Sequence, residues 1–186
     1  MARSFLPCGA ALALLAVPTL VAAQSGPVAA VTSYNAGINA IETGGGGLAQ
    51  RADKFEALVR RTYDMPAIAA LVVGPGWAQA SAADKSRAIA ALTRHSAVSL
   101  AKNFKGPTAT AFTVSPQPIQ RGGSAIVRVT VDKTVLFYRM RGDKIIDVIA
   151  DGVSQLALQR ADLAGTVASG GIAAMVKKLG QLDTVS

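Results

Sequence analysis

The sequence predicts an α+β domain, in which a twisted sheet of four antiparallel strands packs against a helical layer. Between residues 31 and 104 apolar residues recur every three or four positions, the spacing of amphipathic helices. Between residues 108 and 150 they alternate with polar residues, the spacing of half-buried strands. After Gly152 the helical spacing returns. Helices, then a sheet, then helices again is an order typical of the α+β class.

The first 23 residues have the composition of a secretory signal peptide. Arg3 precedes an apolar stretch from residue 10 to residue 21, and small residues follow up to Ala23, where we expect cleavage. We therefore expect that a single domain, residues 24–186, is exported. The one cysteine of the chain, Cys8, lies in this leader. The exported domain is therefore expected to lack disulfides, a thiol nucleophile and thiolate metal ligands.

Positive charge predominates in the chain. The formal net charge is +8, and loss of Arg3 with the leader makes it +7. An exported protein of this charge favours anionic partners such as lipid headgroups, membrane surfaces or acidic protein patches. Nucleic acid is not an expected partner, because the basic residues are scattered and no aromatic residues are interleaved with them. The basic residues nominated for docking are Lys102, Lys105, Arg121, Lys177 and Lys178.

Two amphipathic helices are predicted at the start of the domain. The first carries its apolar stripe between Val31 and Ile41, and the second covers residues 48–63. The glycine run at 43–47 separates them. We interpret this run as a connector, since no strand precedes it and no Gly-Lys-Ser/Thr follows, as a phosphate loop would require.

A third helix is predicted between Asp64, which can cap it, and the stop signal of Gly74 and Pro75. Its residues 67–73 read AIAALVV and present no polar face. A bilayer span needs roughly 20 apolar residues, so this segment is too short to cross a membrane. It is either an ordinary core helix or the wall of an apolar cavity.

A long helix over about residues 82–104 is predicted to begin at a capping box formed by Ser81 and Asp84. His95, the only histidine, lies in the middle of this helix. No Asp, Glu or Cys stands near it at the spacing of metal ligands. A structural or surface role is therefore the expectation for His95, and no metal site is predicted.

The four predicted strands cover residues 108–115, 124–131, 134–141 and 144–150. Two-residue links, Asp132-Lys133 and Gly142-Asp143, are suited to tight hairpins, so a meander is expected. Asp147 is expected on the polar face of this sheet, paired with Arg139 or Arg128. The residues expected to share the apolar face are Phe112, Val114, Val127, Val129, Val131, Leu136, Tyr138, Met140, Ile146 and Val148.

Helical segments at 153–168 and 172–182 close the chain. The stretch DGVSQ at 151–155 resembles a G-x-S-x-G nucleophile elbow only loosely, because position 156 is leucine. We expect Ser154 to cap the following helix and the protein not to be an enzyme. A hydrolase using Ser154 is the enzymatic alternative, and an exported scaffold that binds only protein is a further one.

Three blocks of the sequence resemble the MlaC family, also called the toluene-tolerance family. They are YDMPAIAALVVGPGWAQASAADKSRAIAAL at 63–92, VLFYRMRGDKIIDVIADGVSQL at 135–156 and ASGGIAAMVKKLGQL at 168–182. The blocks keep the order of the family and cover most of the domain. Within them, Asp143 stands where the family has an aromatic residue.

The resemblance implies a monomeric periplasmic lipid carrier that needs no cofactor beyond its phospholipid cargo. Such carriers move phospholipid between an outer-membrane lipoprotein complex and an inner-membrane ABC transporter complex, which maintains outer-membrane lipid asymmetry. It also implies an apolar lipid cavity between sheet and helices. A hopanoid-associated lipid-binding protein of the same family is the alternative. The residues that we expect to contact lipid are Leu71, Val72, Trp77, Leu92, Val127, Val129, Leu136, Tyr138, Met140, Val148 and Val153.

Overall fold

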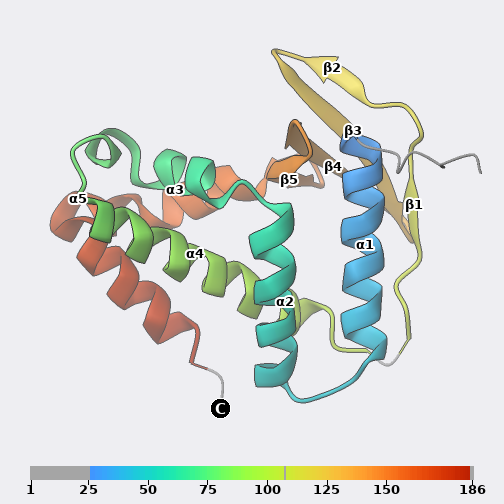
Figure 1. Cartoon of the computed structure of the whole chain (residues 1–186), viewed down its shortest axis with the longest axis horizontal. Helices are drawn as coiled ribbons and strands as arrows, with labels where there is room; N and C mark the ends of the chain where they lie inside the picture. The colour runs from blue at the N-terminus through green and yellow to red at the C-terminus, as the bar shows by residue number, and fades with distance from the viewer. Residues whose placement is uncertain (1–25, 107, 185–186) are drawn as a thin grey trace, which may run out of the picture.

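The computed structural model describes residues 26–106 and 108–184, and the predicted signal peptide lies outside these residues. The described part is an α+β fold, as predicted (Figure 1). Its helices are α1 (Pro27–Thr43), α2 (Leu48–Thr62), α3 (Met65–Val73), the 3-10 helix η1 (Gly74–Trp77), α4 (Ala82–Asn103) and α5 (Gln155–Leu182). Its strands are β1 (Phe112–Val114), β2 (Ile119–Arg121), β3 (Ser124–Val131), β4 (Thr134–Arg141), β5 (Lys144–Ala150) and β6 (Val153–Ser154).

Helix starts follow the predicted capping residues. The Asp64 carboxylate accepts a hydrogen bond from the Ala67 N–H at 3.1 Å and so begins α3. The Ser81 hydroxyl accepts one from the Asp84 N–H at 3.0 Å and begins α4. Each cap satisfies an N–H that has no partner within its own helix. The predicted connector at 43–47 joins the end of α1 to the start of α2.

The sheet has six strands within the described residues, so the expectation of four is wrong. The predicted strand 108–115 contains only the short β1, at 112–114. The strand β2, which was not predicted, follows Pro116 and Pro118 and has three residues. Prolines argue against a strand, and three residues are too few to show an alternating pattern. The two-residue β6 extends the meander after β5.

Antiparallel pairing runs in the order β1-β3-β4-β5-β6, and β2 pairs with the other end of β3. The two predicted hairpins are confirmed, with Val131 opposite Thr134 and Arg141 opposite Lys144. The first turn contains no glycine, and Asp132 adopts a φ of 51° there. Aspartate tolerates this left-handed conformation better than most side chains do, which allows a tight turn to form.

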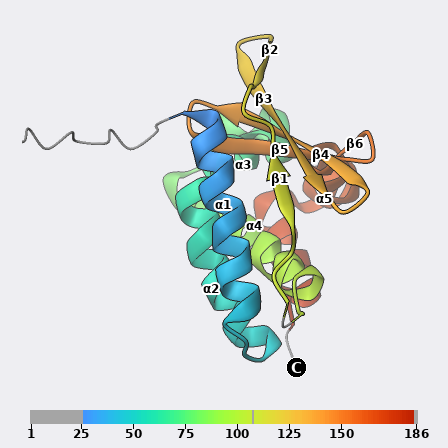
Figure 2. The ribbon, with the colours of Figure 1, turned by 90° about the vertical axis from the view of Figure 1, so that its right-hand side faces the viewer.

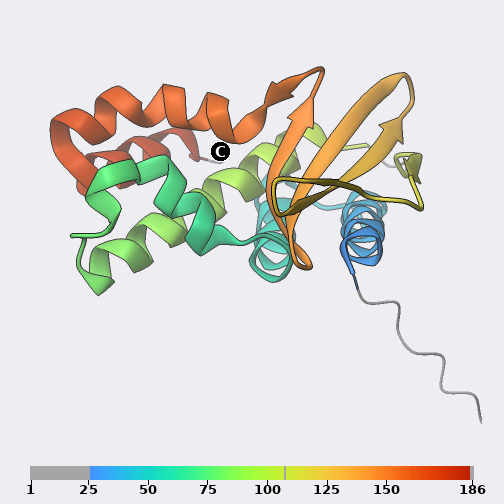
Figure 3. The same cartoon turned by 90° about the horizontal axis from the view of Figure 1, so that it is seen from above.

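Two hydrophobic cores lie side by side in the molecule. One joins the sheet to α1, α2 and the end of α4, and the other joins α3, α4 and α5. Figures 1 and 3 show the sheet and α1 at one end and α3 to α5 at the other. Figure 2 shows α1 against the sheet, where it contacts β1, β3, β4 and β5. Tyr63 and Leu100 pack against both cores, so they mark the boundary between them.

The carboxylate of Asp147 joins the sheet to α5. Its side chain accepts hydrogen bonds from Arg139 Nη2 at 3.0 Å, Ser154 Oγ at 2.7 Å and the Leu156 N–H at 3.1 Å. The predicted pairing with Arg139 is therefore confirmed. Asp147 is only 3% exposed, because the start of α5 covers it. Ser154 caps α5 as predicted, and its Oγ accepts from the Ala157 N–H at 3.0 Å.

Replacing Asp147 with alanine should lower the free energy of unfolding by about 1–3 kcal/mol, because it leaves the part-buried Ser154 hydroxyl and the buried Leu156 N–H without their acceptor. Urea unfolding measures this loss. Asp143→Ala, in the exposed turn between β4 and β5, is the matched control and should change stability by less than about 0.5 kcal/mol. Equal losses in both variants would contradict the anchoring role of Asp147.

Candidate functional site

A cavity of about 540 Å³ lies where the two cores meet, and we call it the central cavity. Its walls come from β4 and β5, from the second half of α4 and from both ends of α5, with contributions from α1, α3 and Tyr63, which follows α2. The lining is mainly apolar. The apolar lining residues are Ile38, Ile68, Leu100, Phe104, Leu136, Ile146, Val148, Ala150, Leu156, Leu158, Leu163, Leu179 and Leu182.

Burial distinguishes an inner end of the central cavity from its mouth. Tyr34, Ile38 and Tyr138 are at most 3% exposed and line the cavity from α1 and β4, and we call this side the inner end. Leu158 and Leu182 line the same cavity yet are 47% and 51% exposed, so they stand at the mouth. The rim of this apolar cavity is therefore itself apolar.

The inner end contains all three tyrosines of the chain. The Tyr34 and Tyr63 hydroxyls are 3.0 Å apart and share a hydrogen bond. The Tyr138 hydroxyl donates to Asn35 Oδ1 at 3.4 Å. The ring of Tyr34 packs edge-on against Tyr63 and against Tyr138, with centroids 5.5 and 5.9 Å apart. This aromatic cluster closes the cavity on the side of α1.

Burial raises the pKa values of these phenols, because the charged form loses its solvation. The pKa of Tyr63 rises to about 12, mainly through burial and with an added contribution from the negative charge of Asp147. Burial likewise raises the pKa values of Tyr34 and Tyr138 well above the usual 10. The hydroxyls therefore keep their protons throughout the physiological range and can act as hydrogen-bond donors.

Polar contacts hold the second half of α5 over the cavity. His95 Nδ1 lies 2.7 Å from a carboxylate oxygen of Asp183. Lys178 Nζ donates to the carbonyl oxygen of Asp162 at 2.7 Å, which ties the two halves of α5 together. The halves meet at Gly171, whose φ of 63° and ψ of −156° interrupt the helix. His95 thus has a structural contact, in agreement with the expectation for it.

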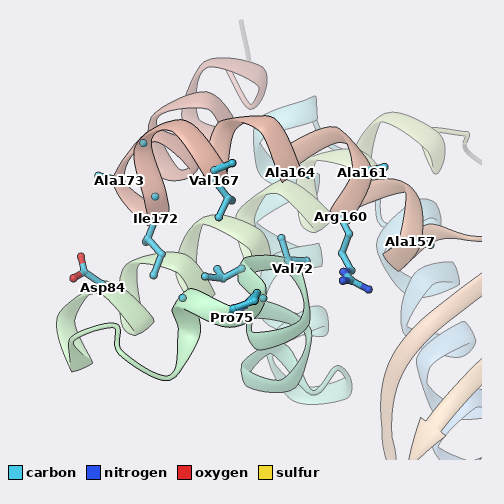
Figure 4. A pocket seen from close by; sticks show the side chains of 16 residues that line it. Val72, Pro75, Asp84, Ala157, Arg160, Ala161, Ala164, Val167, Ile172 and Ala173 are labelled. Carbon is cyan, nitrogen blue, oxygen red and sulfur yellow. The ribbon is translucent and has the colours of Figure 1, made fainter.

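A second hollow, of about 900 Å³, lies between α5 on one side and α3 and η1 on the other, and we call it the α5 groove. Figure 4 shows Val167 and Ile172 of α5 facing Val72 and Pro75 across it. Small side chains such as Ala161 and Ala164, together with Arg160, line the rest of the α5 wall. The first half of α5 therefore has a hollow on each side.

The residues expected to contact lipid fall into three groups. Leu136, Tyr138 and Val148 line the central cavity, and Val72 lines the α5 groove. Leu92, Val127, Val129 and Met140 are 0% exposed and are packed in the cores. Trp77 packs beside the second core, 5.8 Å from Lys85 Nζ, while Leu71 and Val153 are exposed.

The apolar segment 67–73 lies in α3, between the two hollows. Ile68 lines the central cavity, whereas Val72 and Val73 line the α5 groove. Ala69 is fully buried in the core shared with α4 and α5. Only Leu71 among the large residues of this helix is exposed, at 40%. The helix lacks a polar face because it contacts protein or a hollow on nearly every side.

Sequence reasoning did not nominate the cavity residues of α4 and α5. Examples are Leu100 and Phe104 on α4 and Leu156, Leu163 and Leu179 on α5. Leu156 and Leu163 are seven residues apart and therefore lie on one helix face, which is a signal present in the sequence. That signal identifies a buried face but does not say whether protein or a cavity covers it.

Ser154 is the residue on which the hydrolase alternative depends. The hydroxyl of Ser154 is hydrogen-bonded to Asp147 and to a backbone N–H, in the arrangement of a helix cap. Within residues 26–106 and 108–184, no three His, Cys, Asp or Glu side chains gather as a metal site. None of the helices in that part of the chain is long and apolar enough to span a membrane.

Titration of the tyrosines should show the burial of the inner end directly. Because the folded-state pKa of Tyr63 exceeds its unfolded value, stability is fully present below pH 10 and falls as the pH rises through about 12. The native protein should therefore show little phenolate absorbance at pH 10, whereas the urea-unfolded chain should be about half ionised there. Circular dichroism at each pH controls for alkaline unfolding. Native titration near pH 10 with the fold intact would contradict the buried cluster.

Comparison with known proteins places this geometry in a family. No curated protein matches the sequence. Among solved structures, the chain is similar to a phospholipid-binding protein from Ralstonia solanacearum, determined in complex with a phospholipid. The TM-score is 0.67 at 19% identity, and the match covers 84% of this chain and 96% of the other, which shows a common fold. The family model described as MlaC protein matches residues 35–181, and the chain therefore belongs to the MlaC family.

Proposed function

We propose that the protein is a periplasmic lipid carrier that holds phospholipid acyl chains in the central cavity. The observation that carries this proposal is an apolar cavity at the boundary of two cores, with an exposed apolar rim. Membership of the MlaC family supports it. The phospholipid complex of the similar Ralstonia solanacearum protein is further support.

The physical chemistry of the cavity suits a lipid. Its volume falls within the range of about 300–1,000 Å³ that is usual for ligand pockets. Each CH₂ group that leaves water contributes about 0.8 kcal/mol, so an acyl chain binds without any catalytic or strongly polar group. Of the residues expected from the sequence to contact lipid, those that would touch the acyl chains there are Leu136, Tyr138 and Val148.

The wider role that we propose is transport. The carrier would exchange phospholipid with an outer-membrane lipoprotein complex and an inner-membrane ABC transporter complex, and so maintain outer-membrane lipid asymmetry. The positive net charge supports docking to anionic or acidic surfaces. Lys105 and Lys177, both exposed, are the docking candidates whose side chains we propose to test.

Native mass spectrometry of the purified protein should show a lipid-sized adduct that organic solvent removes. The mass of the released lipid distinguishes a phospholipid from a hopanoid. Protein that is empty, and that takes up no added phospholipid after delipidation, would rule out the carrier function. Labelling of Ser154 by a fluorophosphonate would instead support the hydrolase alternative.

A carboxylate placed in the wall should expel the lipid. Val148→Glu and Leu136→Glu each put a charge into the central cavity, where an acyl chain cannot solvate it. The affinity for lipid should fall at least about tenfold, which corresponds to about 1.4 kcal/mol, and lipid occupancy should fall with it. Ile119→Glu, on a residue that is 54% exposed on β2, is the matched control and should leave occupancy unchanged. Folded cavity variants that keep their lipid would show that the cargo binds elsewhere.

Transfer of lipid from donor to acceptor vesicles containing anionic lipid should slow as salt rises. The Debye length shortens from about 10 Å at 0.1 M to about 3 Å at 1 M, which screens docking but not acyl-chain burial. Lys105→Glu/Lys177→Glu should show the same slowing at low salt. Arg128→Glu, on the exposed face of β3, is the control. A transfer rate that ignores both salt and the lysine substitutions would exclude electrostatic docking.

A further inference from the structure

At the inner end of the central cavity, one tyrosine hydroxyl hydrogen has no acceptor among the neighbouring side chains. A tyrosine hydroxyl has one hydrogen to donate and lone pairs to accept with. In the Tyr34–Tyr63 pair, one hydroxyl donates and the other accepts, whichever way the bond runs. The accepting hydroxyl keeps its own hydrogen. Among the residues that the structure describes, no acceptor lies within hydrogen-bonding distance of that hydrogen's oxygen other than the partner hydroxyl.

The neighbouring polar groups do not offer an acceptor. Tyr138 donates its hydrogen to Asn35 Oδ1, which engages the nearest amide oxygen. The other end of that amide, Asn35 Nδ2, is a buried donor without a partner among the described residues. The carboxylate of Asp147 is engaged by Arg139, Ser154 and Leu156. The remaining hydroxyl hydrogen of the tyrosine pair therefore has no acceptor among these neighbouring groups.

An excess donor matters once the cavity is filled. In an empty cavity, water can accept from the free hydroxyl hydrogen. A plain alkyl chain displaces that water and offers no acceptor, and an unsatisfied buried hydrogen-bonding group costs about 1–3 kcal/mol. A ligand that carries an oxygen at the same depth avoids this loss. Such a ligand would be held at both ends, with its polar head at the mouth.

We propose that the Tyr34–Tyr63 hydroxyl pair is a polar subsite that selects lipids whose buried end carries a hydrogen-bond acceptor, such as a hydroxyl or carbonyl oxygen. This inference rests on the proposed function, because it assigns the inner end of the same cavity. Tyr34 is 1% exposed and lies on α1, whereas Leu158 and Leu182, which are exposed at the mouth, belong to α5. The subsite would therefore contact the end of the acyl chain and not the headgroup.

Displacement of a fluorescent fatty acid from the delipidated protein tests the subsite. The competitors are lauric, myristic and palmitic acids, each compared with its ω-hydroxy form. At the chain length that reaches the tyrosines, the ω-hydroxy acid should bind about two- to tenfold more tightly than the plain acid, the effect of one net hydrogen bond. Moving the hydroxyl to carbon 2, beside the carboxyl group, should remove this advantage.

The test variant is Tyr34→Phe/Tyr63→Phe, which removes both hydroxyls and keeps both rings. The matched control is Thr32→Val, which removes an exposed hydroxyl from the same helix, α1, outside the cavity lining. The double variant should lose the preference for ω-hydroxy acids, whereas Thr32→Val should keep it. Thermal melting shows whether each variant is folded. If the double variant does not fold, the comparison of ligands on the unaltered protein still decides the question.

Equal or weaker binding of every ω-hydroxy acid to the unaltered protein would overturn the subsite and leave the lipid-carrier function standing. Retention of the preference in a folded double variant would also overturn it. If neither the fluorescent fatty acid nor any competitor binds, the proposed function fails together with the subsite. These results are therefore distinguishable from one another.

Discussion

The position of α5 depends on one buried carboxylate. Asp147 lies on β5, yet two of its three hydrogen-bond donors belong to Ser154 and Leu156, at the point where the chain leaves the sheet and becomes helical. Arg139 on the neighbouring strand supplies the third donor and its charge. A buried carboxylate is stable only when it is paired and hydrogen-bonded in this way. Because α5 forms walls of both hollows, this anchor determines where they lie.

The central cavity follows from having two cores instead of one. Single cores pack to the density of organic crystals and leave few voids. Here the core on the sheet and the core among α3, α4 and α5 are each well buried, and they meet only through residues such as Tyr63 and Leu100. The space at their boundary remains open, and the exposed Leu158 and Leu182 give access to it. The architecture thus provides a cavity without a poorly packed core.

Local signals in the sequence predict most of the fold. Asp64, Ser81 and Ser154 identify helix starts because their short side chains can satisfy free N–H groups. Alternation finds β3, β4 and β5, which are long enough to show it, but not β2 or β6. The same alternation places Val129 and Leu136 on one face of the sheet. It cannot say that helices cover Val129 completely while Leu136 borders the cavity, because that depends on where distant helices pack.

A carrier must hold its cargo firmly enough to cross water and loosely enough to release it. Burial of alkyl groups supplies affinity without direction, since it depends on area alone. Hydrogen bonds depend on direction, and at the inner end of this cavity they come from the phenol hydroxyls of Tyr34 and Tyr63. Such hydroxyls distinguish between lipids because a buried donor without an acceptor costs free energy. The cost arises only when the cavity holds a chain that carries no acceptor. The proposed selectivity therefore depends on neutral hydroxyls and not on the charged residues that also line the cavity, such as Asp147 and Lys178, which are engaged by other protein groups.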